Sequence, residues 1–289
     1  METALKGVEF IETLLRDAFG VADDFVLSDR EIEILRSAFS RILPYFIVFT
    51  ARSGSTFLLY ELENTLTLSR PYEWFNYDDV ASLVEKQKMT FVEYMLLIVS
   101  ENRSEDGIFG SEINWLQLVA LNAIVPVQKI FPKRIRWFFL RRRNSVAQGI
   151  SHFIAAKSQI YHAYQLRESA SEAINAVAYN AEGIKKHVTE ILRQEAKIED
   201  WLKSMHVAPV NIYYEDIVEN PKRSSMLFAN VMNIWLPKEY LQQTDANPMK
   251  KIGTDRNSEF EQRFRSDEVD FLRDALDQRP LVLLPAKSI

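Results

Sequence analysis

Residues 44–59 join a strand pattern to a short polar segment that could bind an anion. The apolar and aromatic run at 45–49 is typical of a strand buried on both faces, and an apolar helix pattern follows residue 56. Between them stands Ala51-Arg52-Ser53-Gly54-Ser55-Thr56. Small polar residues at such a junction direct backbone N–H groups, hydroxyls and the positive end of the helix dipole at one point. The segment therefore predicts an anion site; the alternative is a plain turn in which Gly54 only relieves the backbone.

The cation of this segment distinguishes it from a nucleoside-triphosphatase P-loop. Such a loop needs a glycine ahead of a Gly-Lys-Ser/Thr triplet, whose lysine reaches the terminal phosphates. This sequence has neither that glycine nor that lysine, and its cation is Arg52. A planar guanidinium can bracket a phosphate or sulfate without a metal. A small-molecule kinase is therefore disfavoured, and no metal is expected.

A second strand-to-helix junction also carries cations. Residues 134–140 predict a strand, an arginine triplet follows at 141–143, and a helix pattern begins at residue 144. Arg143 stands at the end of the strand and Ser151 about two turns into the helix, so both can face one ligand. Ligands of open α/β sheets bind at the carboxyl ends of the strands. We therefore expect this junction to lie beside the first one.

A carboxylate between aromatic residues is the candidate for acid–base work. Glu73 stands in Pro71-Tyr72-Glu73-Trp74-Phe75, a connecting segment in which the proline forbids a continued helix. Apolar surroundings raise the pKa of a carboxyl group and suit it to proton transfer. The alternative is a surface glutamate whose aromatic neighbours are buried.

The remaining pattern alternates between strands and helices. Further strands are predicted at 209–214 and, as a short one, at 108–110; further helices are predicted at 112–124, at 169–205 with a break near Gly183 as an option, at 222–233 and at 258–276. This alternation predicts one α/β domain over residues 44–289. Residues 1–43 predict a helical extension, with helices at 5–19 and after Ser28, which forms a capping box with Glu31. Thr90 and Glu93 show the same capping pattern.

Composition excludes several classes of protein. The chain has 289 residues, is 47% hydrophobic and 26% charged, and carries a net charge of −5, which disfavours general binding to nucleic acid. It has no cysteine, and hence no disulfide or thiolate chemistry. We see no signal peptide and no membrane span, and expect a cytoplasmic protein.

With both junctions in place, the chain resembles sulfotransferases that use 3'-phosphoadenosine-5'-phosphosulfate (PAPS). Within them it is most similar to the Stf0, or trehalose 2-sulfotransferase, family. The resemblance is carried in order by residues 51–56, 71–75, 109–110, 140–151, 214–217 with Pro221, and 251–264. It implies a P-loop-like three-layer sandwich in which helices flank a central, mostly parallel sheet.

The resemblance also implies roles for particular residues. The phosphosulfate of PAPS would be held by Arg52, Ser53, Gly54, Ser55 and Thr56. Its 3'-phosphate would be held by Arg143 and Ser151, with Lys251 as a late contact. Arg52 would also face the charge that develops on the leaving 3',5'-diphosphoadenosine.

The chemistry implied by the resemblance is sulfuryl transfer to a hydroxyl of a carbohydrate or glycolipid-like acceptor. Glu73 matches the general base of the family. Other sulfotransferase branches use a histidine as the base; here His152 follows Ser151 directly and is interpreted as a packing residue. Family members pair through helices, so the resemblance implies a homodimer.

Some residues depart from the family pattern. Ala51 replaces a common proline, Glu112 stands where many members have lysine, and residues 157–161 differ after the second helix. Glu112 and residues 157–161 lie near the position where the family binds its acceptor, so trehalose itself is not predicted as the acceptor. They also keep a second interpretation open, namely a catalytically silent relative that binds nucleotide or glycan or serves as a scaffold.

Overall fold

A computed structural model describes residues 13, 15–161, 168–243 and 255–279 of the chain. Its centre is a sheet of strands β1 (Leu43–Phe49), β2 (Ile108–Asn114), β3 (Arg136–Arg141) and β4 (Val210–Tyr213). The strand order is β2-β1-β3-β4, and every pairing is parallel. Because β1 pairs on both sides and its side chains from Pro44 to Phe49 are buried, its nearly continuous apolar sequence is what a central parallel strand requires.

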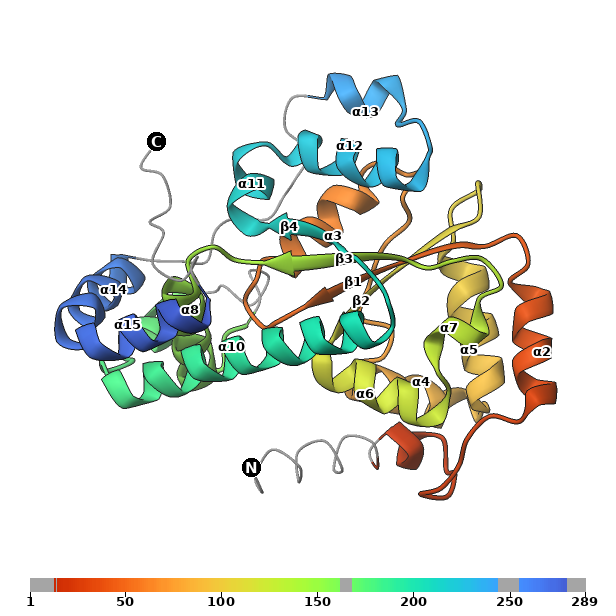
Figure 1. The fold of residues 1–289 in the computed structure, drawn as a ribbon, viewed down its shortest axis with the longest axis horizontal. Helices are drawn as coiled ribbons and strands as arrows, with labels where there is room; N and C mark the ends of the chain where they lie inside the picture. Colours follow the sequence, from red (N-terminus) through yellow and green to blue (C-terminus); the bar gives the residue numbers. More distant parts are fainter. Residues whose placement is uncertain (1–12, 14, 162–167, 244–254, 280–289) are drawn as a thin grey trace.

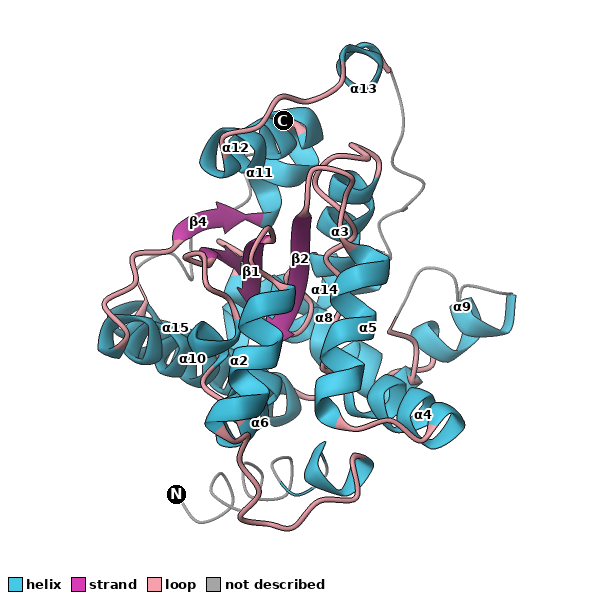
Figure 2. Ribbon diagram, turned by 90° about the vertical axis from the view of Figure 1, so that its right-hand side faces the viewer, coloured by secondary structure: helices cyan, strands magenta, loops and turns pink. Residues whose placement is uncertain are grey.

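Helices cover both faces of this sheet (Figures 1 and 2). Tyr45 and Ile47 of β1 face one side, where they pack with α3 (Ser55–Glu63) and α12 (Pro221–Met232). Phe46 and Val48 face the other side, where the core includes residues of α5 (Phe91–Asn102), α6 (Trp115–Ile124) and α10 (Ala181–Ser204). This alternation follows from the strand period of two residues. The predicted α/β fold with flanking helices is confirmed.

A second group of helices lies beyond the carboxyl ends of the strands. The arrowhead of β3 in Figure 1 points toward the side that holds α8 (Ser145–Ser158), α14 (Asp255–Asp267) and α15 (Val269–Gln278). These helices share a separate apolar core with α9 (Glu168–Asn175) and part of α10. The edge of the sheet where ligands are expected is thus bordered by α8.

The remaining helices complete the two layers. They are α2 (Asp29–Ala38), α4 (Tyr77–Gln87), α7 (Val127–Ile130), α11 (Tyr214–Glu219) and α13 (Lys238–Gln242). Both predicted capping boxes are confirmed, at the start of α2 and at the start of α5. α2 packs against α5 and α7 and contributes Leu35 to the same core as the sheet. The division of the chain at residue 43 stays a prediction, and most of the expected helix at 5–19 lies outside the described residues.

Three predicted helices have different bounds in the structure. The helix expected at 112–124 begins only at Trp115, because Asn114 caps it and β2 continues through Glu112. The helix expected at 169–205 is divided into α9 and α10, where Asn180 caps the first turn of α10. The helix expected at 258–276 is divided into α14 and α15 at Glu268. At Asn114 and Asn180 a side-chain cap marks the helix start, whereas the break at Glu268 has no side-chain cap.

Candidate active site

The loop between β1 and α3 contains two residues with a left-handed backbone. Arg52 has φ of 64° and Gly54 has φ of 95°, both in the left-handed region. Gly54 also lies against the ring of Tyr214, which a Cβ atom would approach to 2.3 Å. A non-glycine residue with positive φ is strained, and such strain concentrates at functional sites. Among the described residues, the buried hydroxyl of Ser53 has no hydrogen-bond partner, so it can donate to a bound anion.

Arg52 connects the two strand-to-helix junctions. Its Nε donates to Oγ of Ser151 at 3.2 Å, and its Nη1 donates to the carbonyl oxygen of Tyr161. Burial lowers the pKa of Arg52, and the positive charge of Arg142 lowers it further. Because an arginine stays protonated in spite of such shifts, the loop holds a desolvated cation close to a second one. An anion bound there would relieve both effects.

The arginine triplet at the end of β3 is divided among different partners. Arg141 forms ion pairs with Glu195 at 3.0 Å and Glu199 at 2.7 Å, both on α10. Arg143 forms a bidentate pair with Asp216, with distances of 2.6 and 2.7 Å. These two guanidinium groups are therefore engaged with carboxylates of the chain itself.

Arg142 is the member of the triplet that points toward the first loop. Its guanidinium lies 4.8 Å from the centre of the Tyr214 ring, the same ring that packs on Gly54. Its buried Nε has no partner in the part of the chain that the structure describes. Sequence reasoning selected Arg143 and missed Arg142. The signal in the sequence was the triplet itself; β3 ends at Arg141, so the packing after the strand decides which of the following arginines faces the loop.

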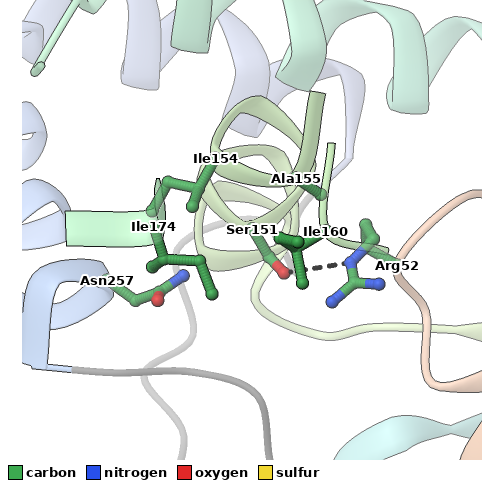
Figure 3. A pocket seen from close by; sticks show the side chains of 7 residues that line it. All are labelled: Arg52, Ser151, Ile154, Ala155, Ile160, Ile174 and Asn257. Atoms are coloured by element: carbon green, nitrogen blue, oxygen red, sulfur yellow. Dashed lines mark hydrogen bonds between the residues drawn. The ribbon is translucent and has the colours of Figure 1, made fainter. Parts of the chain in front are cut away.

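A small pocket opens beside the contact between Arg52 and Ser151 (Figure 3). It holds about 260 Å³ of unfilled space, including space open to solvent. Apolar side chains from α8, α9 and the segment after α8 form its walls, and Asn257 of α14 faces it from the other side. Its lining residues are Arg52, Ser151, Ile154, Ala155, Ile160, Ile174 and Asn257. A cation and a hydroxyl at the border of an apolar pocket suit a ligand with an anionic group and a flat apolar part.

Glu73 is held against β2 by its neighbours in the chain. The carbonyl oxygen of Tyr72 accepts the N–H of Glu112 at 3.0 Å, and the indole N–H of Trp74 donates to the carbonyl oxygen of Gly110 at 3.0 Å. The connecting segment is thus fixed to the sheet rather than free at the surface. The alternative interpretation as a surface glutamate is not supported.

The carboxyl group of Glu73 has the environment that a base requires. Its Oε2 accepts a hydrogen bond of 2.9 Å from Nε2 of Gln117 on α6. Burial raises the pKa of Glu73 above its ordinary value, the hydrogen bond from Gln117 opposes this shift, and Asp79 adds to it. Gln117 is a site residue that sequence reasoning missed, since nothing nearby in the chain relates it to Glu73.

A second buried carboxyl group connects Glu73 to the loop between β1 and α3. Glu112 makes a side-chain hydrogen bond with Ser55 and senses the negative charge of Glu73. Ser55 is the first residue of α3 and part of the loop that contains Arg52. The base candidate and this loop therefore lie at one site.

The other candidate residues have simpler outcomes. Lys251 lies outside the described residues. His152 packs on His187, with ring centroids 4.4 Å apart, and burial lowers its pKa to about 4. A histidine with that pKa is neutral at pH 7 but a weak base, which agrees with a packing role. In the described part of the chain, His, Asp and Glu side chains form no group that could hold a metal ion.

The turns from β1 into α3 and from β3 into α8 both lie at the carboxyl edge of a parallel sheet. This arrangement is typical of α/β proteins that bind a phosphorylated ligand at that edge. The sequence specifies this further. The chain belongs to the Stf0 sulphotransferase family, whose pattern it matches over residues 44–267. It is therefore a sulfotransferase, and the resemblance noted in the sequence is confirmed.

Individual relatives are distant. The chain is 21% identical over 217 residues to the trehalose 2-sulfotransferase of Mycobacterium tuberculosis (strain ATCC 35801 / TMC 107 / Erdman). The aligned region covers 62% of this chain and 80% of that protein. It is similar to the sulfotransferase domain of the olefin synthase of Synechococcus PCC 7002, with a TM-score of 0.40 and 12% identity over 82% of this chain and 94% of that domain.

Proposed function

We propose that this sulfotransferase uses PAPS as the donor and sulfates a hydroxyl of a carbohydrate or glycolipid-like acceptor. The observation that carries the proposal is the contact of 3.2 Å between Arg52 and Ser151, with Arg142 nearby. It joins the loop that matches the phosphosulfate site of the family to the helix that matches its 3'-phosphate site. PAPS is distinguished from ordinary adenine nucleotides by carrying anionic groups at both positions.

The donor site combines cations, hydroxyls and a helix N-terminus. Ser53, Gly54, Ser55 and Thr56 offer hydroxyls and backbone N–H groups at the start of α3, and Arg52 supplies the positive charge. Arg142 adds a second cation, supported by its contact with Tyr214 and its proximity to Arg52. The unpartnered Ser53 hydroxyl and Arg142 Nε fit an anionic ligand.

The 3'-phosphate is proposed to lie against Ser151 and Arg143. The ion pair of Arg143 with Asp216 is partly exposed, with side-chain exposures of 31% and 50%, so a dianionic phosphate can compete for the guanidinium. Lys251 keeps its proposed role as a late contact. The bound donor supplies the sulfuryl group and leaves as 3',5'-diphosphoadenosine.

Glu73 is proposed to accept the proton of the acceptor hydroxyl. A carboxylate whose pKa is raised by burial is a stronger base than a solvated one, and a placed base contributes about 10² to 10⁴ in rate. The rest of the rate enhancement comes from in-line positioning and from cations facing the leaving phosphate. The proposed base, Glu73, and the proposed cations, Arg52 and Arg142, are all side chains of this protein.

Ligand class can be tested by thermal unfolding with 3',5'-diphosphoadenosine, AMP and ATP–magnesium. A ligand at about 100 times its Kd stabilises the protein by roughly 2.7 kcal/mol. We expect the diphosphate to stabilise the protein at concentrations where AMP does not. Equal responses to AMP and the diphosphate would contradict the assignment of Arg143 and Ser151.

Catalysis can be tested by transfer of labelled sulfate from PAPS into a panel of sugars and glycolipids. We expect Glu73→Gln to lower turnover by about 10² to 10⁴ without weakening nucleotide binding. We expect His152→Asn, which tests the other candidate base, to keep turnover within a few-fold of the wild type. Nucleotide binding without transfer to any acceptor would favour the catalytically silent alternative.

Assembly and location stay proposals as well. We propose a cytoplasmic homodimer with a small-molecule or glycolipid acceptor, and sedimentation of the purified chain measures the assembly. Of the helices in the described residues, none has the length and apolar character needed to span a membrane.

A further inference from the structure

Glu112 is a buried acid that interacts with Ser55 and Glu73 of the candidate active site. It lies on β2, paired in register with Ile47 of the central strand, and its side chain is 2% exposed. Its Oε1 is buried and has no hydrogen-bond partner within the described ranges of the chain. A buried ionised carboxylate requires a partner for its charge, so the ionisation state of Glu112 needs an explanation.

The groups around Glu112 provide no compensating positive charge. In the described part of the chain, the charged and titratable groups that interact with it are Glu73 and Tyr45. Its hydrogen-bond partner is the neutral hydroxyl of Ser55. Burial raises the pKa of Glu112 well above its ordinary value, and the negative charge of Glu73 raises it further, against the effect of Ser55. Of the two glutamates, Glu73 therefore ionises first.

We propose that Glu112 is a positioning residue that acts as an uncharged carboxylic acid, holds the Ser55 hydroxyl in the donor loop, and weakens donor binding when it loses its proton. This rests on the proposed function, because it assumes that Ser55 borders the phosphosulfate of PAPS. When Glu112 is neutral, it does not repel a polyanionic donor that is bound next to Ser55. An ionised Glu112 repels the donor and also Glu73.

Many family members have a lysine at the position of Glu112, where an ionised carboxylate would oppose the binding of an anion. A proton on Glu112 makes the position electrically neutral, so the donor loop keeps its positive character from Arg52 and Arg142. Loss of that proton at alkaline pH places a negative charge beside the loop that contains Arg52.

The test is the pH dependence of the Kd of 3',5'-diphosphoadenosine for the full chain, measured between about pH 6 and about pH 10. For the wild type we expect the Kd to rise about tenfold for each pH unit above the pKa of Glu112. For Glu112→Gln, which keeps an acceptor for Ser55 and cannot ionise, we expect a Kd that does not rise in this way over the same pH range. Comparison of the two proteins cancels the titration of the ligand itself.

A matched control removes another buried acid from the same neighbourhood. Glu61 lies on α3, the helix that Ser55 begins, is 3% exposed, and accepts a hydrogen bond from Tyr240. We expect Glu61→Gln to keep the alkaline rise of the wild type. An alkaline rise in Glu112→Gln equal to that of the wild type, or loss of its binding at neutral pH, would overturn the proposal.

A second measurement needs no variant and decides the question if Glu112→Gln does not fold. Calorimetry of the wild type in buffers of different ionisation enthalpy reports the protons taken up on binding. On the alkaline limb we expect uptake that approaches one proton per nucleotide, and zero uptake there overturns the proposal. A wild type that binds no diphosphate at any pH would instead contradict the proposed function itself.

Discussion

Single contacts set the chemistry of the candidate site. Burial raises the pKa of Glu73, the proposed base, and Gln117 limits this shift by donating a hydrogen bond to its carboxylate. The pKa of the base is therefore a balance between burial and one amide. That balance can be changed without touching the base itself.

Gln117→Leu should move the acidic limb of turnover to higher pH. The amide favours the ionised form of Glu73, so its loss raises the pKa of Glu73, and the base is ionised only at a higher pH. We expect turnover to fall at acidic pH and to recover on the alkaline side, as measured by the pH profile of kcat. Gln128→Leu, a partly buried glutamine near Met205, serves as the control. A profile unchanged by Gln117→Leu would contradict the role of the amide.

Arg142 and Arg143 should differ in the phosphate that they recognise. Arg142 lies by the loop of Arg52, so Arg142→Met should weaken AMP and 3',5'-diphosphoadenosine alike. Arg143→Met should weaken the diphosphate alone. The loss of a charge-assisted contact of about 1.5–3 kcal/mol corresponds to roughly 10- to 100-fold in Kd. Titration calorimetry with both nucleotides measures this; the same pattern for both variants would refute the division of roles.

At the scale of elements, the turn from β1 into α3 determines how the start of α3 is positioned. Gly54 provides both a positive φ and room for the ring of Tyr214 from α11, which holds the loop against the end of β4. The start of α3 is thus held in place by a glycine and by an aromatic residue far away in the sequence. Loop geometry and donor binding should be lost together.

Gly54→Ala should destabilise the fold and weaken nucleotide binding. The left-handed φ costs an alanine about 1–2 kcal/mol, and the collision with Tyr214 adds about 1–3 kcal/mol. Gly20→Ala is the matched control, because Gly20 has φ of 62° with nothing within 4 Å of the added Cβ. Urea unfolding should show a larger loss for Gly54→Ala, and equal losses would exclude the contact with Tyr214 as a cause.

Across the whole molecule, the end of the described chain supports the second junction. Arg279 is 6% exposed and donates to the carbonyl oxygen of Arg142 at 2.7 Å and to the hydroxyl of Ser145. It also pairs with the buried Glu195 at 3.1 Å. A residue beyond the family match at 44–267 thus fixes the turn from β3 into α8.

Arg279→Met should lower the free energy of unfolding by about 3–5 kcal/mol, because removal of one partner leaves a buried charge poorly compensated. Arg273→Met is the control: Arg273 is 68% exposed and pairs with Asp270, and such surface pairs contribute about 0–1 kcal/mol. Denaturant unfolding of both variants measures the difference. Similar small losses would mean that the buried network does not stabilise the fold.

The sequence alone determined the features that depend on neighbours in the chain. The apolar run of β1, the polar loop after it and the capping boxes at Ser28 and Thr90 each arise from hydrogen bonds and burial patterns within a few residues. The ordered motifs also identified the family. These features could be predicted because local periodicity and capping specify them.

Only the tertiary structure decided which side chains meet. The hydrogen bond from Gln117 to Glu73, the link from Glu112 to Ser55 and the choice of Arg142 as neighbour of Arg52 join elements far apart in sequence. Such contacts depend on strand order and on how each strand leads into the loop and helix that follow it. A strand alternates its faces at every residue, so a shift of one position moves a charge to the other side of the sheet.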